Sequence, residues 1–206
     1  VRNVAKARAL AGPGITITDD PYEIVLDPSI DIVCEVIGGT EIARDLVTEA
    51  IAQGKSIVTA NKALLAIHGN ELFAAASERG VMIAFEAAVA GGIPIIKALR
   101  EGLTGNRIEW LAGIINGTTN YILSEMRDKG LSFDAALADA QRLGYAEADP
   151  AFDIEGIDAA HKLALLAANA FGMPVNFADV QVQGITALQP LDVACAEQLG
   201  YRIKLL

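Results

Sequence analysis

Five carboxylates and one lysine lie close together in residues 144–162, whose sequence is GYAEADPAFDIEGIDAAHK. In chain order these residues are Glu147, Asp149, Asp153, Glu155, Asp158 and Lys162. Asp158 and Lys162 are four positions apart, so a helix would carry both side chains on one face. A lysine can give or take a proton, and carboxylates pair with substrate amines. The segment suggests a proton-transferring lysine behind an amine-binding loop.

The helix predicted from about Ile154 to Phe171 is apolar on nearly all sides. From Ile157 onward its only fully charged residues are Asp158 and Lys162. As a surface ion pair they would contribute about 0.3–0.5 kcal/mol and need no other role. A helix this apolar is expected to be buried, however, and a buried lysine needs a partner. For the loop before it, a solvated acidic turn remains the plain alternative.

Composition narrows the class of protein. The chain has 206 residues and a formal net charge of -10, which disfavours nucleic acids and anionic membranes as partners. Two cysteines and two histidines make neither a disulfide framework nor a histidine-rich zinc site. There is no apolar signal segment and no apolar run long enough to cross a bilayer. We expect a soluble cytoplasmic protein without a membrane partner.

The first 65 residues read as part of a doubly wound α/β domain. An apolar strand over 31–37 ends at Gly38-Gly39-Thr40, a helical pattern covers 41–54, and a second strand leads into Thr59-Ala60-Asn61-Lys62. Strand, helix and strand in about thirty residues predict a parallel pair. Ligands bind where such strands end. The two polar strand ends are therefore candidate binding positions, and Lys62 is either a ligand-facing lysine or a solvated turn residue.

The rest of the chain predicts an α+β domain for substrate binding and dimerisation, with a mixed sheet. The fold class is thus a partial doubly wound, Rossmann-like parallel sheet followed by this second domain. Expected strands cover 81–89, 107–115 and 180–185, and expected helices cover 70–79, 93–103, 118–129, 132–143, 154–171 and 190–199. The predicted divisions are 1–65 for the partial dinucleotide-binding domain, 66–188 for the catalytic domain, and 189–206 for a tail returning to the first domain.

Two further motifs each have a plain alternative. Residues 116–120, NGTTN, are either a helix start capped by Thr118 or a set of N–H groups for an anion. Glu86 with Ala90-Gly91-Gly92 is either a tight turn or a hard-cation site. Cys34 lies in an apolar strand and is expected to be a small core residue. The dinucleotide fingerprint GxGxxG is absent from the printed sequence.

Several of these segments together resemble homoserine dehydrogenase. The matching pieces are DIVCEVIGG, SIVTANKALLA, FEAAVAGGIPII, LAGIINGTTNYIL and GYAEADPAFDIEGIDAAHKLALLA. The resemblance implies reversible reduction of L-aspartate 4-semialdehyde to L-homoserine with NADPH or NADH, in threonine, methionine and isoleucine biosynthesis. It also implies a homodimer. It further implies that this chain lacks the family's N-terminal glycine-fingerprint unit and its C-terminal end.

The resemblance also implies roles for individual residues. For catalysis it implies Lys162 as the acid/base, with Asp158 and Lys62. For substrate binding it implies Glu147, Asp153, Asp158, Lys62 and Gly117. For the cofactor it implies Gly38, Gly39, Thr40, Thr59, Lys62 and Gly117. For a structural monovalent cation such as sodium it implies Glu86, Val89, Gly91 and Ile93.

The N-terminal segment VRNVAKAR bears on the choice between NADP and NAD. If the chain begins at the second strand of the dinucleotide fold, Arg2 and Lys6 stand where a 2′-phosphate is met, and no acid does. This favours NADP, while a solvated basic segment is the alternative.

Three hypotheses remain from the sequence. The first is a homoserine dehydrogenase, and the second is a non-catalytic remnant that binds or dimerises without hydride transfer. The intact set of Lys62, Asp158 and Lys162 favours the first, and the missing fingerprint favours the second. A different semialdehyde or amino-acid dehydrogenase is disfavoured because neither Cys34 nor Cys195 falls in a plausible nucleophile loop.

Overall fold

The computed structural model describes residues 3–206, which form two compact units, unit 1 ending at Ile96 and unit 2 covering Lys97–Leu206. Arg2, one of the predicted phosphate contacts, lies outside the described residues. The sequence predicted a division near residue 65, about thirty residues earlier. The later division follows from the sheet of the first unit, because its third strand and most of the helix before it come after residue 65.

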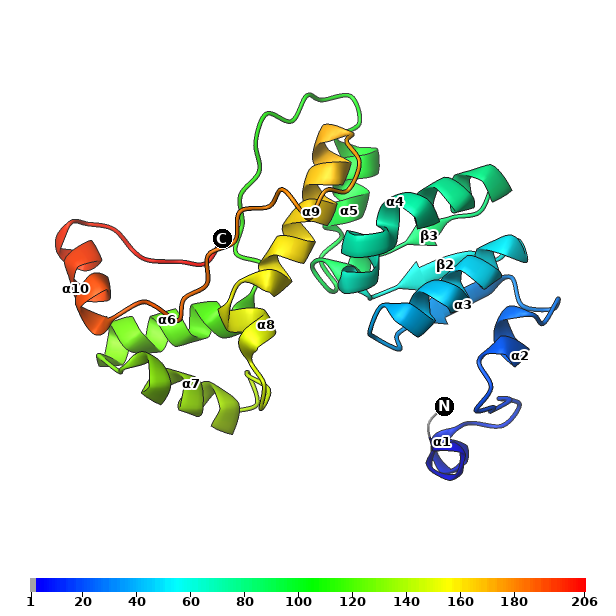
Figure 1. The fold of residues 1–206 in the computed structure, drawn as a ribbon, viewed down its shortest axis with the longest axis horizontal. Coiled ribbons are helices and arrows are strands. Elements are labelled where there is room, and N and C mark those ends of the chain that lie inside the picture. Colours follow the sequence, from blue (N-terminus) through cyan, green and yellow to red (C-terminus); the bar gives the residue numbers. More distant parts are fainter. Residues whose placement is uncertain (1–2) are drawn as a thin grey trace. The chain divides into compact units, whose positions relative to one another are not determined.

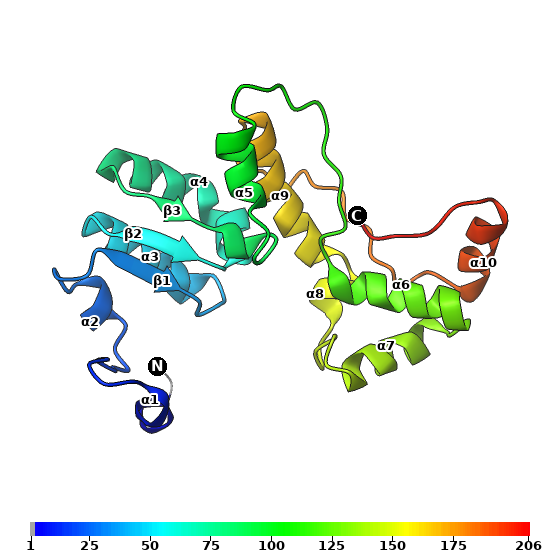
Figure 2. The ribbon, with the colours of Figure 1, turned by 180° about the vertical axis from the view of Figure 1, so that it is seen from behind.

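Unit 1 contains a parallel sheet of three strands in the order β1 (Ile32–Glu35), β2 (Ser56–Thr59) and β3 (Ile83–Ala84). Between them run α3 (Glu41–Ala52) and α4 (Lys62–Arg79). The predicted strand–helix–strand unit is confirmed. Glu35 stands opposite Thr59 in the register, so the carboxyl ends of β1 and β2 are neighbours. The two helices lie side by side over one face of the sheet (Figures 1 and 2).

The helix α4 is longer than the sequence predicted. The pattern indicated a helix over 70–79, but the helix begins at Lys62 because the Asn61 side chain caps it, accepting the Leu64 N–H at 3.1 Å. Leu64 and Leu65 are fully buried in its first turn. Gly80 ends the helix in the left-handed conformation, as C-terminal glycines often do. The cap therefore turns the exit of β2 directly into helix.

Alternation along the strands gives unit 1 one covered sheet face and one exposed face. Ile57 is fully buried under the helices, whereas Val58 is 41% exposed. Cys34 is in register with Val58 and is exposed too. The prediction that Cys34 is a core residue is therefore wrong. A strand places successive side chains on opposite faces, and Cys34 points away from α3 and α4.

Short elements complete unit 1 and cross into unit 2. They are α1 (Val4–Leu10), α2 (Tyr22–Val25), the 3₁₀ turn η1 (Glu86–Ala88), α5 (Ile95–Lys97) and the π-helical turn η2 (Ala98–Gly102). The predicted strand over 81–89 shrinks to two residues, because the chain turns at η1. The Glu86 carboxylate accepts the Ile96 N–H at 2.7 Å and so ties this turn to the start of α5.

Unit 2 is helical in its described residues. Its helices are α6 (Gly117–Lys129), α7 (Phe133–Arg142), α8 (Ala151–Ile154), α9 (Ile157–Phe171) and α10 (Pro190–Gln198). The helix α6 packs against α7, α8 and α10 (Figure 1). Ile122, Leu123 and Met126 of α6 are at the centre of that core. Ser132 caps α7, and Gly172 ends α9.

The mixed sheet predicted for the second domain is not confirmed. Within the described part of unit 2 no strand is assigned, and both 107–115 and 180–185 are irregular. A strand pattern becomes a strand only with a partner for its backbone groups. In the first segment Trp110 is 76% exposed and Ile114 55% exposed, so these two apolar side chains are largely uncovered by the described residues.

The C-terminal tail packs against α6 within unit 2, and its return to the first domain stays a prediction. The Asn120 side chain on α6 donates to the Leu205 carbonyl at 2.9 Å and accepts the Leu205 N–H at 3.2 Å. The Asn120 amide thus binds both backbone groups of Leu205, as a residue on a neighbouring strand would. The tail is therefore held to α6 by its main chain as well as by α10.

Gly184 allows the loop after α9 to press against the junction of α8 and α9. A Cβ at Gly184 would lie 2.5 Å from the Ile154 carbonyl oxygen and 2.6 Å from the Glu155 Cα. The next residue, Ile185, donates its N–H to the same Ile154 oxygen at 2.8 Å. We expect Gly184→Ala to destabilise the protein by about 1–3 kcal/mol, because the loop must move away.

Chemical denaturation followed by circular dichroism measures this loss. Gly105→Ala is the matched control, since a Cβ there meets nothing within 4 Å. Equal midpoints for Gly184→Ala and Gly105→Ala would mean that the loop tolerates the displacement.

Candidate functional site

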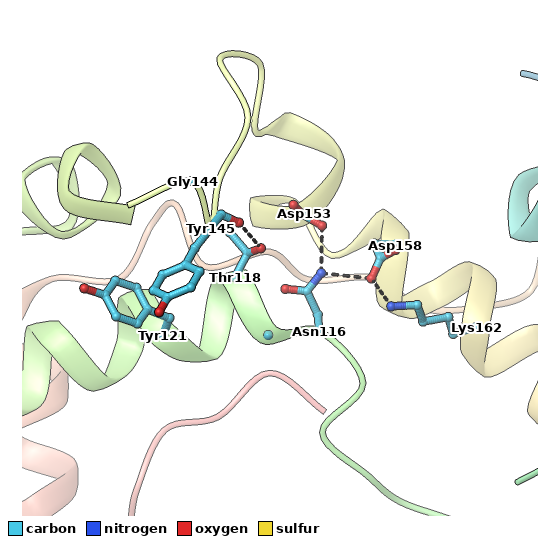
Figure 3. Close-up of a pocket in the computed structure, with 9 residues that line it drawn as sticks. Asn116, Thr118, Tyr121, Gly144, Tyr145, Asp153, Asp158 and Lys162 are labelled. Carbon is cyan, nitrogen blue, oxygen red and sulfur yellow. Dashed lines mark hydrogen bonds and ion pairs between the residues drawn. The ribbon is translucent and has the colours of Figure 1, made fainter. Parts of the chain in front are cut away.

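A cavity of about 560 Å³ opens in unit 2 where α6, the loop before α8, α8 and α9 meet (Figure 3). Its lining residues are Asn116, Gly117, Thr118, Tyr121, Gly144, Tyr145, Asp153, Asp158 and Lys162. Figure 3 shows two tyrosine rings at one end and the amide, the two carboxylates and the lysine at the other. The cavity thus has an aromatic end and an ionic end.

Lys162 is held by two acceptors at the ionic end. Its Nζ donates to Asp158 Oδ2 at 2.7 Å and to the Ile115 carbonyl at 2.7 Å. The lysine side chain is 16% exposed and the aspartate side chain 5% exposed. The predicted pairing of these two residues on one helix face, largely away from water, is confirmed. A lysine ammonium has three N–H donors, so one remains for an oxygen in the cavity.

Asn116 joins the two carboxylates of the site. Its Nδ2 donates to Asp153 Oδ1 at 2.7 Å and to Asp158 Oδ2 at 2.9 Å (Figure 3). Its Oδ1 accepts from the N–H of Thr119 at 2.9 Å and from its hydroxyl at 2.7 Å. Asn116 is therefore the N-cap of α6, and the expectation that Thr118 caps this helix is wrong. The NH₂ end of the amide thus serves the two carboxylates, and its oxygen serves the start of the helix.

The aromatic end is formed by Tyr121 and Tyr145, whose ring centroids are 4.9 Å apart. The Tyr121 hydroxyl donates to Asp139 Oδ2 at 2.8 Å. This hydrogen bond is the main cause that raises the pKa of Tyr121 to about 12, with desolvation and the charge of Asp139 adding to it. Tyr121 therefore keeps its proton at neutral pH and donates it to Asp139 in this hydrogen bond.

Removing the Asp139 carboxylate is expected to lower the pKa of Tyr121. In Asp139→Asn the hydroxyl faces a neutral amide, so the pKa of Tyr121 should fall from about 12 toward its ordinary value of 10.0. Tyrosinate absorbance against pH would show one of the four tyrosines of the chain titrating earlier. Asp128→Asn is the control, because that carboxylate pairs with Arg127. Identical titration curves for wild type and Asp139→Asn would contradict this origin of the shift.

The structure brings four of the predicted residues together in the cavity, namely Gly117, Asp153, Asp158 and Lys162. Glu147 does not line it. This residue is exposed in the loop after α7, where its carbonyl accepts the Gln141 Nε2 at 3.1 Å. Sequence reasoning missed the bridging role of Asn116 and the two tyrosines. An Asn before a helix start signals a cap, but nothing in the sequence connects it to acids 37 and 42 residues away.

The predicted cofactor residues of unit 1 gather at the carboxyl ends of β1 and β2. Gly38 and Gly39 have φ of +79° and +73°, a region that favours glycine. Thr40 is the N-cap residue of α3, Thr59 ends β2 and Lys62 is the first residue of α4. Both loops thus leave neighbouring parallel strands at the same sheet edge.

The N-terminal cofactor prediction fits the structure less well. Lys6 lies in α1, whose start is capped by Asn3 through the Lys6 N–H at 2.9 Å. The premise that the chain begins in a strand is therefore wrong for the described residues from Val4 onward. A short helix forms here because Asn3 offers a cap and the residues that follow are good helix formers.

The predicted cation residues occupy a compact turn after β3. The N–H groups of Val89 and Ala90 both donate to the Glu86 carbonyl, and Gly91 has φ +61°. The Ile93 carbonyl accepts the Ile95 N–H at 2.8 Å. Across residues 3–206 no three His, Cys, Asp or Glu side chains cluster as metal ligands.

No helix within residues 3–206 has both the length and the apolar character needed to cross a membrane.

Comparison with known proteins agrees with both units. The family model "Homoserine dehydrogenase" matches residues 94–206, and the model "Homoserine dehydrogenase, NAD binding domain" matches residues 1–86. The homoserine dehydrogenase of Pseudomonas aeruginosa is 63% identical over 188 residues, which are 91% of this chain and 43% of that protein. This chain therefore spans less than half of that relative's length.

Solved structures give the same result. A homoserine dehydrogenase from Thiobacillus denitrificans superposes with a TM-score of 0.95 at 68% identity, covering 99% of this chain and 47% of that chain. A hyperthermophilic archaeal homoserine dehydrogenase in complex with NADPH superposes with a TM-score of 0.75 at 32% identity, covering 88% of this chain and 56% of that chain. With matches in both units, the chain belongs to the homoserine dehydrogenase family.

Proposed function

We propose that this chain acts in the reversible interconversion of L-homoserine and L-aspartate 4-semialdehyde, as an NADP- or NAD-dependent oxidoreductase. The observation that carries the proposal is the Asp158–Lys162 pair at 2.7 Å, facing a cavity of about 560 Å³. The membership of the chain in the homoserine dehydrogenase family supports the same reaction.

Lys162 is the proposed proton donor and acceptor. When bound, the nicotinamide cofactor supplies or accepts the hydride. Lys162 would donate a hydrogen bond to the substrate oxygen and pass it a proton during reduction of the aldehyde. Asp158 and the Ile115 carbonyl aim the ammonium, since each holds one of its N–H groups. In the oxidation of L-homoserine, the same lysine would take the hydroxyl proton.

Carboxylates and one backbone position are the proposed substrate contacts. Asp153 lines the cavity and is held by Asn116 at 2.7 Å, so it is fixed for pairing with the substrate ammonium. Gly117 begins α6 at the cavity wall, where its lack of a side chain leaves room. Glu147 keeps its predicted role as a second amine contact. Lys62 keeps its predicted role as a second catalytic and binding lysine.

The proposed cofactor site is the strand-end edge of unit 1, formed by Gly38, Gly39, Thr40, Thr59 and Lys62. The space around the two glycines at this edge fits a dinucleotide. A Cβ at Gly38 or Gly39 would meet nothing within 4 Å, so the backbone is open to a ligand. A relative of 32% identity is described as bound to NADPH, which supports NADP. Lys6 remains a proposed phosphate contact.

The remaining predictions concern the wider protein. We keep a structural monovalent cation at Glu86, Val89, Gly91 and Ile93, a homodimer, a cytoplasmic location and a place in threonine, methionine and isoleucine biosynthesis as proposals. The carbonyl-rich turn that follows β3 supports the cation.

The test is L-homoserine-dependent reduction of NADP by this chain, followed by nicotinamide absorbance. We expect reduction by the wild-type chain and its loss in Lys162→Ala. If the wild-type chain binds NADPH but gives no homoserine-dependent reduction, the proposal that this stretch of chain is catalytic would be wrong. Reduction that survives in Lys162→Ala would overturn the role of the lysine alone.

A further inference from the structure

Glu35 is a buried carboxylate at the end of β1 that the proposed chemistry does not use. It is only 3% exposed, although it lies at the ligand edge of the sheet. Glutamate is almost never buried to this extent without partners, because removing its charge from water is costly. Its partners therefore indicate what it does.

The Glu35 carboxylate accepts three hydrogen bonds from the two strand-end loops. Oε1 accepts the N–H of Ile37 at 2.8 Å and the N–H of Gly38 at 3.3 Å. Oε2 accepts the Thr59 hydroxyl at 2.6 Å. One oxygen thus fixes the loop that leaves β1, and the other reaches the last residue of β2.

The hydrogen bonds continue from Thr59 back to the first loop. The Thr59 hydroxyl oxygen accepts the Asn61 N–H at 2.9 Å. The Asn61 Nδ2 donates to the Gly39 carbonyl at 2.7 Å, and its Oδ1 caps α4. The network closes on itself, so Glu35 holds both loops in one arrangement. This network includes three of the proposed cofactor residues, Gly38, Gly39 and Thr59.

We propose that Glu35 is a positioning residue for the dinucleotide, and that its carboxylate holds the Gly38-Gly39 turn in the conformation that binds the cofactor. The inference rests on the proposed function, since it takes the strand-end edge as the cofactor site. Both glycines have positive φ, a conformation that a flexible loop reaches at little cost and leaves as easily. A fixed acceptor beneath the turn removes that freedom before the ligand arrives.

Glu35→Gln is the informative substitution because it keeps the shape and changes the donors. A carboxylate offers only acceptors, whereas a glutamine amide has one acceptor oxygen and one NH₂ donor. Whichever way the amide is turned, either the Thr59 hydroxyl or the amides of Ile37 and Gly38 lose their acceptor. A buried donor without an acceptor is unfavourable, so the turn shifts.

The experiment is fluorescence titration of NADPH into the full chain, combined with amide hydrogen exchange over residues 36–40. For Glu35→Gln we expect the NADPH Kd to rise about tenfold or more, and the Ile37 and Gly38 amides to exchange about tenfold faster or more. Where turnover is measurable, the KM for NADP should rise while the KM for L-homoserine stays unchanged. Glu78→Gln is the control, with the same change of charge at an exposed position near the end of α4.

A purely structural role would give a different result. Loss of folded protein lowers the amplitude of the titration but leaves the Kd of the folded fraction unchanged. If Glu35→Gln does not fold, Glu35→Asp takes its place, because it keeps the charge but is one methylene too short to reach both loops. We expect an intermediate rise in Kd for that variant.

A variant Kd within about twofold of wild type would overturn the inference, because the expected rise is about tenfold or more. A raised Kd with unchanged amide exchange would overturn it too, because Glu35 would then act by another route. Absence of NADPH binding in the wild-type chain would instead overturn the proposed cofactor site, and the inference with it.

Discussion

Lys162→Ala is expected to reduce kcat for L-homoserine oxidation by about 10²- to 10⁴-fold, the range typical of a lost general acid or base. Lys162 is the residue whose Nζ faces the cavity between Asp158 and the Ile115 carbonyl. The Kd for NADPH should stay unchanged, because Lys162 is not among the predicted dinucleotide contacts. The measurement is a steady-state assay together with a fluorescence titration of the same sample.

The matched control is Lys129→Ala. Lys129 also pairs with an acid four residues away, Glu125, but its side chain is 58% exposed. The two substitutions thus remove the same side chain and the same kind of pair, one at the cavity and one at the surface. Equal rates for both variants would remove Lys162 from the mechanism. A circular dichroism spectrum checks that Lys162→Ala remains folded.

Asn116→Asp is expected to be the most damaging single change in the cavity. The Asn116 side chain is nearly buried and donates to two carboxylates at 2.7 and 2.9 Å. An aspartate in its place would put three carboxylates in contact and remove both donated hydrogen bonds. We expect a loss of about 3–5 kcal/mol of folding free energy near neutral pH, comparable to breaking a buried charged pair, and a loss of turnover as Asp158 shifts.

The pH dependence of this loss has a definite sign. Protonation of one of the three carboxylates restores a donor and removes one charge, so the difference from wild type should shrink as the pH falls. Denaturation curves at neutral and mildly acidic pH measure it. The control is Asn176→Asp, which also brings a carboxylate to an aspartate, Asp179, but at an exposed position. A pH-independent loss would point to packing rather than charge.

The parts of the site that depend on local sequence were predictable. The spacing of Asp158 and Lys162 defines one helix face, and the apolar residues around them indicated their burial. The strand-end glycines followed from the alternation of strand and helix, because parallel strands bring their carboxyl ends to one edge. In both cases the geometry is decided by neighbours within a few positions.

The parts that depend on distant partners were not predictable. Asn116 meets carboxylates that are far away in sequence, and Glu35 meets a hydroxyl 24 residues later. The segment 107–115 has the composition of a strand, yet it pairs with no strand among residues 3–206. Trp110 in this segment is exposed. Periodicity predicts that a segment can form a strand, but it does not identify the strand it would pair with.

The Asp158–Lys162 pair has a mechanical consequence. Both residues stand on α9, one helical turn apart, so the pitch of the helix alone fixes the distance between their backbones. Rearrangements that leave α9 wound can carry the pair as a rigid body without separating acid from amine. Asn116 contacts Asp158 from a different helix, at the start of α6, so the Asn116–Asp158 hydrogen bond would break first under strain. Loosening of the cavity would therefore release the amide before it disturbed the ion pair.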